Sequence, residues 1–144
     1  MTIAADGEAV TRVRFGDAPL GLPMQASAPA DLAAEQLAEY FAGTRRAFTV
    51  PLRPAGTPFQ RQVWEALQTI PYGETAAYGQ VARQIGRPSA ARAVGMAIHH
   101  NPIAVIIPCH RVVGANGALT GYAAGLPMKR RFLEWEATVK KKEG

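Results

Sequence analysis

The sequence predicts two domains. The first is a short α/β amino-terminal domain with a partly truncated sheet plus a helix, and the second is a mostly α-helical carboxy-terminal domain of the helix-turn-helix (winged-helix-like) kind. Three observations predict this class. Strand-like segments occur near the amino terminus, a segment rich in proline and glycine lies near residue 55, and helical apolar spacing follows it. We therefore expect an amino-terminal domain over residues 1–55 and a carboxy-terminal domain over residues 56–144.

The amino-terminal segment has the pattern of a β-hairpin. Residues 2–5 and 10–15 are apolar and β-branched enough for two strands, and Asp6-Gly7 between them is typical of a turn. Residues 16–30 are rich in Gly, Pro and Ala, which predicts a loop. The expected sheet starts almost at Met1 and is accordingly short.

A helix is expected after this loop. Asp31 can cap its amino terminus, and its apolar face would carry Leu32, Leu37 and Phe41. Residues 48–52 suggest one more short strand. Pro54, Gly56 and Pro58 then mark the expected domain boundary.

The carboxy-terminal domain should begin with an amphipathic helix that Thr57 or Pro58 opens and that residues 71–73 end. Its apolar face carries Phe59, Val63, Trp64 and Leu67. Residues 75–85 predict a second helix, and residues 89–99 predict a third, with Ser89 as its cap. The turn between them, residues 86–88, contains Gly86, and two helices joined in this way indicate a helix-turn-helix unit.

The third helix is unusual for a DNA-reading helix, because Arg92 is the one long polar side chain within residues 89–95. Direct readout of the major groove needs several long polar side chains. Small residues allow a close approach to a narrower groove while one arginine enters the base stack, which favours sequence-tolerant binding with base extrusion. Packing of the alanines against another helix is the alternative.

The single cysteine, Cys109, follows an apolar run at residues 104–107 that predicts a short buried strand, which Pro108 closes. A thiol with a pKa of about 8.5 is only a few per cent ionised at neutral pH, so nucleophilic chemistry needs a nearby base or positive charge. His110 and Arg111 can supply them. The alternative is a small buried apolar side chain. Because neighbouring side chains on a strand point apart, His110 reaches Cys109 only through a turn or a bridging water.

Composition narrows the function classes. One cysteine excludes an internal disulfide, and the three histidines beside it do not match usual zinc spacings, so we expect neither a metal nor a cofactor. No apolar stretch approaches the roughly 20 residues that span a bilayer, and we expect a cytoplasmic protein. Residues 41–144 carry 14 basic against five acidic residues. This excess favours nucleic acid as partner, with an anionic membrane second and a solvated basic surface as the alternative.

Taken together, the short motifs between about residues 30 and 136 resemble the O6-alkylguanine-DNA alkyltransferases, or methylated-DNA–protein-cysteine S-methyltransferases. The segments that carry the resemblance, in order, are Gly56-Thr57-Pro58-Phe59, Val63-Trp64, Ile70-Pro71-Tyr72-Gly73-Glu74-Thr75, Ala91-Arg92-Ala93-Val94-Gly95, Asn101-Pro102, Pro108-Cys109-His110-Arg111-Val112-Val113 and Gly121-Tyr122.

The resemblance implies DNA repair by direct reversal. The alkyl group of O6-alkylguanine, with O4-alkylthymine as a further candidate, would pass irreversibly to Cys109, once per molecule. His110 would take the thiol proton through a water while Glu136 holds the imidazole. Asn101 would brace the active-site turn, and Tyr78 would donate a hydrogen bond to the departing base.

The resemblance also implies a DNA surface and a base pocket. A monomer would bind double-stranded DNA through the minor groove, with cooperative binding an open alternative, and Arg92 would replace the flipped nucleotide. The remaining DNA-binding residues would be Ser89, Ala90, Ala91, Gly95, Tyr78 and Arg111, and the walls of the base pocket would be Tyr122, Ala123, Val112 and Ile98.

Two other functions compete with this one. A non-catalytic helix-turn-helix protein that marks lesions would bind damaged DNA without reacting, and the thiol of Cys109 argues against it. A cysteine hydrolase built on Cys109 and His110 would need turnover and an oxyanion hole, and would leave the DNA-binding helix without a role.

Overall fold

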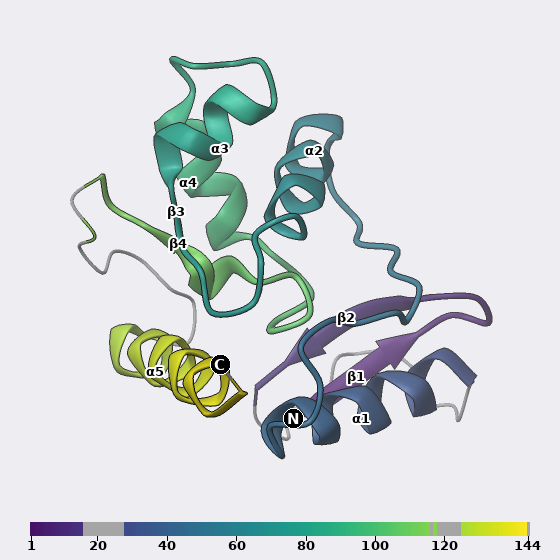
Figure 1. Cartoon of the computed structure of the whole chain (residues 1–144). Helices are drawn as coiled ribbons and strands as arrows, with labels where there is room; N and C mark the ends of the chain where they lie inside the picture. The colour runs from purple at the N-terminus through teal and green to yellow at the C-terminus, as the bar shows by residue number, and fades with distance from the viewer. Residues whose placement is uncertain (16–27, 116, 118–124, 144) are drawn as a thin grey trace. The chain divides into compact units, whose positions relative to one another are not determined.

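The computed structural model describes residues 1–15, 28–115, 117 and 125–143, and its contacts divide the chain into two compact units (Figure 1). The first unit comprises residues 1–55 and 102–106, and the second comprises residues 56–101 and 107–144. The predicted mixture of helices and small sheets is confirmed. The predicted domain limits differ from these units in that residues 102–106 group with the amino-terminal segment.

The first unit contains the predicted hairpin. Strands β1 (Thr2–Ala5) and β2 (Val10–Arg14) pair antiparallel. The carboxylate of Asp6 accepts the backbone N–H groups of Glu8 and Ala9, each at 2.8 Å. These bonds satisfy the turn amides that the strand ladder leaves free, which explains why the chain reverses at this aspartate.

Helix α1 (Ala28–Phe41) begins earlier than predicted. Asp31 lies in the first turn of the helix rather than at its cap. In the first turn its negative charge still interacts favourably with the positive end of the helix dipole. The buried face also differs, since Phe41 is 45% exposed and Leu32 is half-buried. The side chains that the helix buries are Pro29, Ala33, Gln36, Leu37 and Tyr40. Of the predicted loop, residues 16–27 lie outside the described part of the chain.

The strand expected at residues 48–52 is not formed, and only Leu52 bridges Val10 of β2. A buried amide takes the place of a ladder. The carbonyl oxygen of Gln36 accepts the N–H groups of Thr49 and Val50 at 3.0 and 3.2 Å, and its amide nitrogen donates to the Thr49 hydroxyl at 2.6 Å. Pro51 has no N–H to contribute, so strand pairing cannot continue through it.

The strand expected at residues 104–107 is also absent. Val13 of β2 donates its N–H to Pro102 O at 3.0 Å and accepts the Ala104 N–H at 3.1 Å, which holds the segment as a single bridge. Val105 then adopts φ +68°, and Ile106 N–H donates to Ala104 O at 2.8 Å. This is a γ-turn with positive φ, a strained conformation for a β-branched residue. The apolar run is therefore buried as a tight turn.

In the second unit, helix α2 (Pro58–Leu67) forms as predicted. The Thr57 hydroxyl accepts the Gln60 N–H at 3.1 Å and the Gln60 side chain accepts the Thr57 N–H at 2.9 Å, so the two residues form a capping box. On the buried face, Trp64 is 1% exposed and its indole N–H donates to Ala97 O at 2.8 Å. This bond ties α2 to helix α4 (Ala91–His99).

The predicted helix pair is present with shifted ends. The second helix, α3 (Tyr78–Gln84), starts three residues later than expected, because strand β3 (Ala76–Ala77) precedes it and pairs parallel with β4 (Val112–Val113). Gly86 reverses the chain at φ +80°, as predicted. The residue before α4 is Ala90, which makes no side-chain cap, so the expected cap at Ser89 is wrong.

The last helix, α5 (Leu126–Glu143), was not predicted from the sequence. Its buried side chains are Lys129, Phe132, Glu136 and Val139, spaced by three and four residues. Two of these four are charged, which hides the apolar stripe. None of the helices within the described residues combines the length and the apolar composition that a membrane span requires.

Replacing Thr57 with alanine removes one half of the capping box. We expect the free energy of unfolding to fall by about 1 kcal/mol, as for other N-caps. Thr57→Ser keeps the hydroxyl and should stay near the wild-type value. Urea denaturation of the three proteins measures both, and an alanine variant as stable as the serine variant would refute the capping role.

Candidate active site

The site is organised around Glu136, a carboxylate on α5 with no exposed surface. Oε2 accepts Nε2 of His110 at 2.7 Å and Nη2 of Arg111 at 3.0 Å, while Oε1 accepts Nε of Arg111 at 2.8 Å and the N–H of Gly73 at 3.1 Å. Burial raises the pKa of Glu136, but the hydrogen bonds from His110 and Arg111 and the charge of Arg111 outweigh burial and lower the pKa from 4.5 to about 2. Glu136 is therefore a stable anion.

Arg111 is placed differently from the expectation that it contacts DNA. Arg111 is 6% exposed, and its guanidinium pairs with Glu136 through two nitrogens and donates from Nη1 to Ile70 O at 2.7 Å. It also lies over the Tyr72 ring, 5.5 Å from the centroid. A guanidinium engaged in this way is not available to a phosphate at the surface.

His110 follows Cys109 in a short 3₁₀ turn, η1 (Cys109–Arg111), so the strand alternation that would separate the two side chains does not apply. The imidazole is fully buried and lies against Phe132, with ring centroids 5.2 Å apart. Burial lowers its pKa and outweighs the opposing effect of Glu136. A neutral ring that hydrogen-bonds Glu136 carries its proton on Nε2.

The other ring nitrogen, Nδ1 of His110, is buried and has no hydrogen-bond partner among the described residues. In the tautomer that Glu136 selects, Nδ1 is a basic lone pair. A buried acceptor of this kind is normally satisfied by protein or by water. The arrangement provides a base with its proton-accepting atom open.

Cys109 is 6% exposed, and its thiol is free. Burial raises its pKa, against the smaller lowering effects of the Asn101 side chain and the Lys129 charge. The thiol is therefore protonated at neutral pH and depends on a base for nucleophilic reactivity.

Asn101 lies just beyond α4, and its Nδ2 donates to Ile107 O at 3.0 Å. Cys109 N–H donates to the same carbonyl at 2.8 Å. One acceptor thus joins the end of α4 to the turn that carries the thiol, which is a geometry suited to bracing that turn.

Lys129 is a buried site residue that the sequence analysis missed. It has no exposed surface, and Nζ donates to Val112 O. Burial lowers its pKa, and the charge of Cys109 opposes that effect. The sequence signal for Lys129 is that it shares one helical stripe with Glu136. A lysine or glutamate is rarely fully buried without a partner, so two charged residues on a buried stripe indicate a site.

The residues expected on the DNA surface lie around the start of α4. Ser89 and Arg92 are exposed, and Ala90, Ala91 and Gly95 are half-buried. A Cβ on Gly95 would lie 3.7 Å from the ring of Tyr78, which begins α3, so these two residues are neighbours. The opposite side of α4 is buried through Val94, Ala97 and Ile98. The alanines before Val94 are thus only partly covered by packing.

Ile98 and Val112, expected in the base pocket, are both buried, at 5% and 0% exposure. The other two expected pocket residues, Tyr122 and Ala123, lie outside the described residues. Over the same described ranges, no group of three His, Cys, Asp or Glu residues could hold a metal ion.

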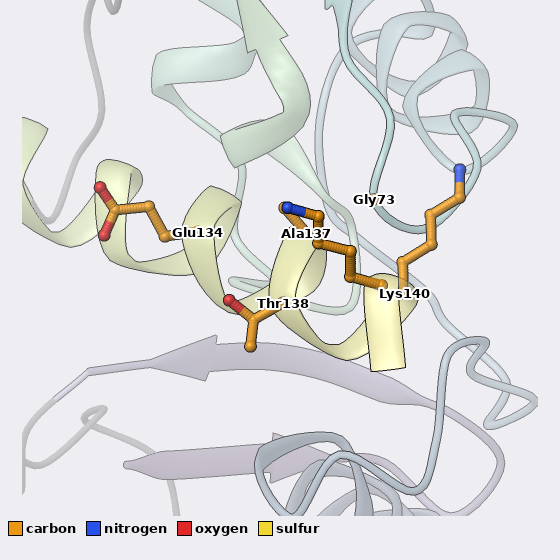
Figure 2. Close-up of a pocket in the computed structure, with 6 residues that line it drawn as sticks. Gly73, Glu134, Ala137, Thr138 and Lys140 are labelled. Carbon is orange, nitrogen blue, oxygen red and sulfur yellow. The ribbon is translucent and has the colours of Figure 1, made fainter. Parts of the chain in front are cut away.

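A separate shallow pocket of about 450 Å³ lies along α5, with Gly73 contributed by the loop before β3 (Figure 2). Its lining contains none of the expected site residues and consists of Gly73, Glu134, Ala137, Thr138, Lys140 and Lys141. Gly73 has φ +78°, and a Cβ there would lie 2.7 Å from Cδ of Lys140. Lys140 therefore covers the turn whose amide supports Glu136.

The family profile described as "6-O-methylguanine DNA methyltransferase, DNA binding domain" matches residues 58–138. A methylated-DNA–protein-cysteine methyltransferase of Methanosarcina acetivorans is 58% identical over 106 residues, which cover 74% of this chain and 68% of that relative. Its Mycobacterium bovis counterpart is 61% identical over 104 residues, 72% of this chain and 63% of that relative.

Among solved structures, Mycobacterium tuberculosis OGT in complex with DNA aligns with a TM-score of 0.87 and 48% identity over 95% of this chain and 86% of that one. The matches to the curated relatives span about two thirds of their length.

Replacing Glu136 with glutamine keeps the shape but removes the anion, which leaves the Arg111 charge buried without its partner. We expect a loss of about 3–5 kcal/mol in the free energy of unfolding. Glu134→Gln, at an exposed position of the same helix, is the matched control and should change little. Equal stability of the two variants in urea denaturation would contradict the role of Glu136.

The stability of the protein should also depend on acid pH. Because the pKa of Glu136 is lowered from 4.5 to about 2 on folding, its stabilisation is complete above pH 4.5 and is lost as the pH falls towards 2. The difference in melting temperature between the wild type and Glu136→Gln should therefore narrow over that interval. A constant difference down to pH 2 would show that Glu136 is not held as an anion.

Proposed function

Because the chain belongs to the O6-methylguanine DNA methyltransferase family, we propose that it repairs O6-alkylguanine in DNA by direct reversal, transferring the alkyl group irreversibly to Cys109. Each molecule acts once, since the thioether product is not hydrolysed. The observation that carries this proposal is the arrangement of Cys109, His110 and Glu136. Nδ1 of the His110 imidazole has no hydrogen-bond partner among the described residues, and Nε2 is held by the buried carboxylate of Glu136.

The chemistry follows from that arrangement. A water between the thiol and Nδ1 of His110 passes the thiol proton to the imidazole, and Glu136 stabilises the imidazolium that forms. The Cys109 sulfur attacks the alkyl carbon, the carbon–O6 bond breaks, and its electron pair leaves with the guanine. The proton then returns from His110 to the base, so that a thioether and guanine are the products.

Three further residues support this reaction. Tyr78 is proposed to donate a hydrogen bond to the departing base, and Asn101 is proposed to brace the turn through Ile107 O. Arg111 takes the role of a positioning residue for Glu136, in place of a DNA contact. Ile98 and Val112, with Tyr122 and Ala123, are proposed walls of the base pocket. O4-alkylthymine is a candidate second substrate.

DNA is proposed to bind to α3 and α4. These helices, with β3 and β4, are proposed to act as a winged-helix-like unit. The exposed Arg92 enters the duplex where the target nucleotide flips out, and Ser89, Ala90, Ala91 and Gly95 allow the close approach to the minor groove. A monomer suffices for this geometry. We also propose a cytoplasmic location.

Intact-protein mass spectrometry tests the proposed function. The protein is mixed with duplex DNA that carries one O6-methylguanine, and one mass increase of about 14 Da on the Cys109 peptide is expected from one transferred methyl group. Cys109→Ser should bind the DNA without gaining mass. A wild-type protein that binds but keeps its mass is a lesion-binding protein, and repeated turnover without mass gain indicates a hydrolase.

The role of Arg92 predicts a difference between substrates. Arg92→Ala should slow repair of duplex DNA by roughly tenfold to a hundredfold, since unstacking a base costs a few kcal/mol, while its reaction with free O6-benzylguanine stays near the wild-type rate. Arg61→Ala, exposed on α2, serves as the control. Equal losses on both substrates would remove the proposed insertion role.

A further inference from the structure

Met96 is an apolar side chain at a position of α4 where an amphipathic helix normally carries a polar one. It is 57% exposed, the most exposed of four large apolar side chains that the described residues leave at the surface. The other three, Met1, Phe41 and Leu126, lie outside the helix pair α3 and α4. Single exposed apolar side chains are common on proteins, so the exposure of Met96 gains meaning only from its neighbours.

The neighbours of Met96 along α4 define a solvent-facing ridge. Arg92, Met96 and His99 are all exposed and follow one another at intervals of four and three residues, which places them on one face of the helix. The opposite face carries the buried residues Val94, Ala97 and Ile98. A surface that takes the side chain of Arg92 therefore also meets Met96, about 6 Å farther along the helix axis.

The surroundings of this ridge carry positive charge without acidic residues. No aspartate or glutamate occurs in the sequence between Glu74 and Glu134. Within the same stretch, α3, α4 and the turn between them carry the exposed arginines Arg83, Arg87 and Arg92. Such a surface attracts a polyanion and repels the same basic face of a second copy of the chain. Duplex DNA is therefore the occupant that fits the ridge.

The dimensions of the minor groove select the side chains that reach its floor. The groove is about 6 Å wide, whereas an α-helix with its side chains is about 10–12 Å across. The body of α4 does not fit within that width, so long side chains on its ridge make the contacts with base edges. Arg92 and Met96 are long, and Ala93 and Gly95 between them are small. Minor-groove proteins use methionine among the apolar side chains that they press between base pairs.

We propose that Met96 is a specificity-determining residue, which lies on the floor of the minor groove beside the point where Arg92 enters and favours A·T over G·C pairs there. The proposal rests on the function proposed above and adds a preference for the sequence around the lesion. Because 6 Å spans about two base steps of 3.4 Å, the preference falls within two base pairs of the flipped nucleotide.

The preference follows from the chemistry of the groove floor. A·T pairs present only acceptors in the minor groove, whereas G·C pairs add the N2 amino group of guanine as a donor. The thioether of Met96 is a weak acceptor. It displaces water from the amino group without replacing the hydrogen bond, which is unfavourable for a buried donor. Against an A·T pair no such donor is lost.

The test is a cycle between the Met96 side chain and the guanine N2 amino group. Binding is measured in the Cys109→Ser background, so that the lesion stays unreacted. The two base pairs on each side of O6-methylguanine are either G·C or inosine·C, and inosine lacks only the amino group. A change in base-pair stability affects both proteins equally, so the difference between Met96 and Met96→Ala reports the contact itself. Inosine should tighten binding about fivefold more with Met96 than with Met96→Ala, the low end of discrimination by one base contact.

Two further variants serve as controls. Met96→Leu keeps the apolar volume and should retain most of the inosine effect that Met96→Ala loses. Leu126→Ala, at an exposed apolar position of α5, should behave as the unsubstituted protein. Met96 contacts no phosphate in this arrangement, so Met96→Ala should leave the slope of log K against log salt unchanged. Alanine and leucine are good helix formers, and folding of both Met96 variants is expected.

Equal inosine effects with and without the methionine side chain overturn the proposal, and so does a changed salt slope in Met96→Ala. Absence of duplex binding by every variant overturns both this proposal and the proposed function. A Met96-dependent inosine effect supports the groove contact even if the wild-type protein keeps its mass on O6-methylguanine DNA. That combination contradicts alkyl transfer alone, so the two failures are distinct.

Discussion

The buried carboxylate of Glu136 is the interaction on which the rest of the site depends. A single carboxylate accepts hydrogen bonds from His110 and Arg111 of the η1 turn and from the Gly73 amide in the loop before β3. Burying one ion is unfavourable, but a carboxylate with both oxygens occupied and an arginine beside it stays charged. The helix that carries it, α5, is thereby tied to the turn that carries the thiol. The contacts that stabilise this part of the fold also position the groups that react.

The Glu136 carboxylate influences the protonation states of the residues around it. Glu136 orients the imidazole of His110 with the proton on Nε2, burial keeps the ring neutral, and Nδ1 is left as the base. The thiol of Cys109 stays protonated because it is buried, so its reactivity depends on a proton acceptor nearby. A nucleophile protected in this way suits a protein that reacts once, since a permanently ionised thiol would be consumed by oxidants and other alkylating agents.

The sequence predicted those parts of the fold whose signals are local. The hairpin at Asp6, the helix capped by Thr57 and the reversal at Gly86 each depend on side-chain or backbone preferences within a few residues. Non-local packing explains the failures. Residues 104–107 have the apolar character of a strand, yet the chain turns at Val105, and Ser89 looks like a cap but lies one residue too early. Helix α5 was missed because Lys129 and Glu136 interrupt its apolar stripe. Cys109 and His110 were identified from their residue types, whereas the burial of Arg111 is set by a residue 25 positions away.

The central claim is that Glu136 holds His110 as the neutral tautomer with Nδ1 free to accept a proton. Nitrogen NMR of protein labelled with ¹⁵N-histidine measures this directly, with the His110 signals assigned by their loss in His110→Asn. At pH 7 we expect a protonated Nε2 and an unprotonated Nδ1 at His110, while the exposed His99 and His100 serve as internal references. Protonation of both His110 nitrogens at that pH, or a proton on Nδ1 alone, would contradict it.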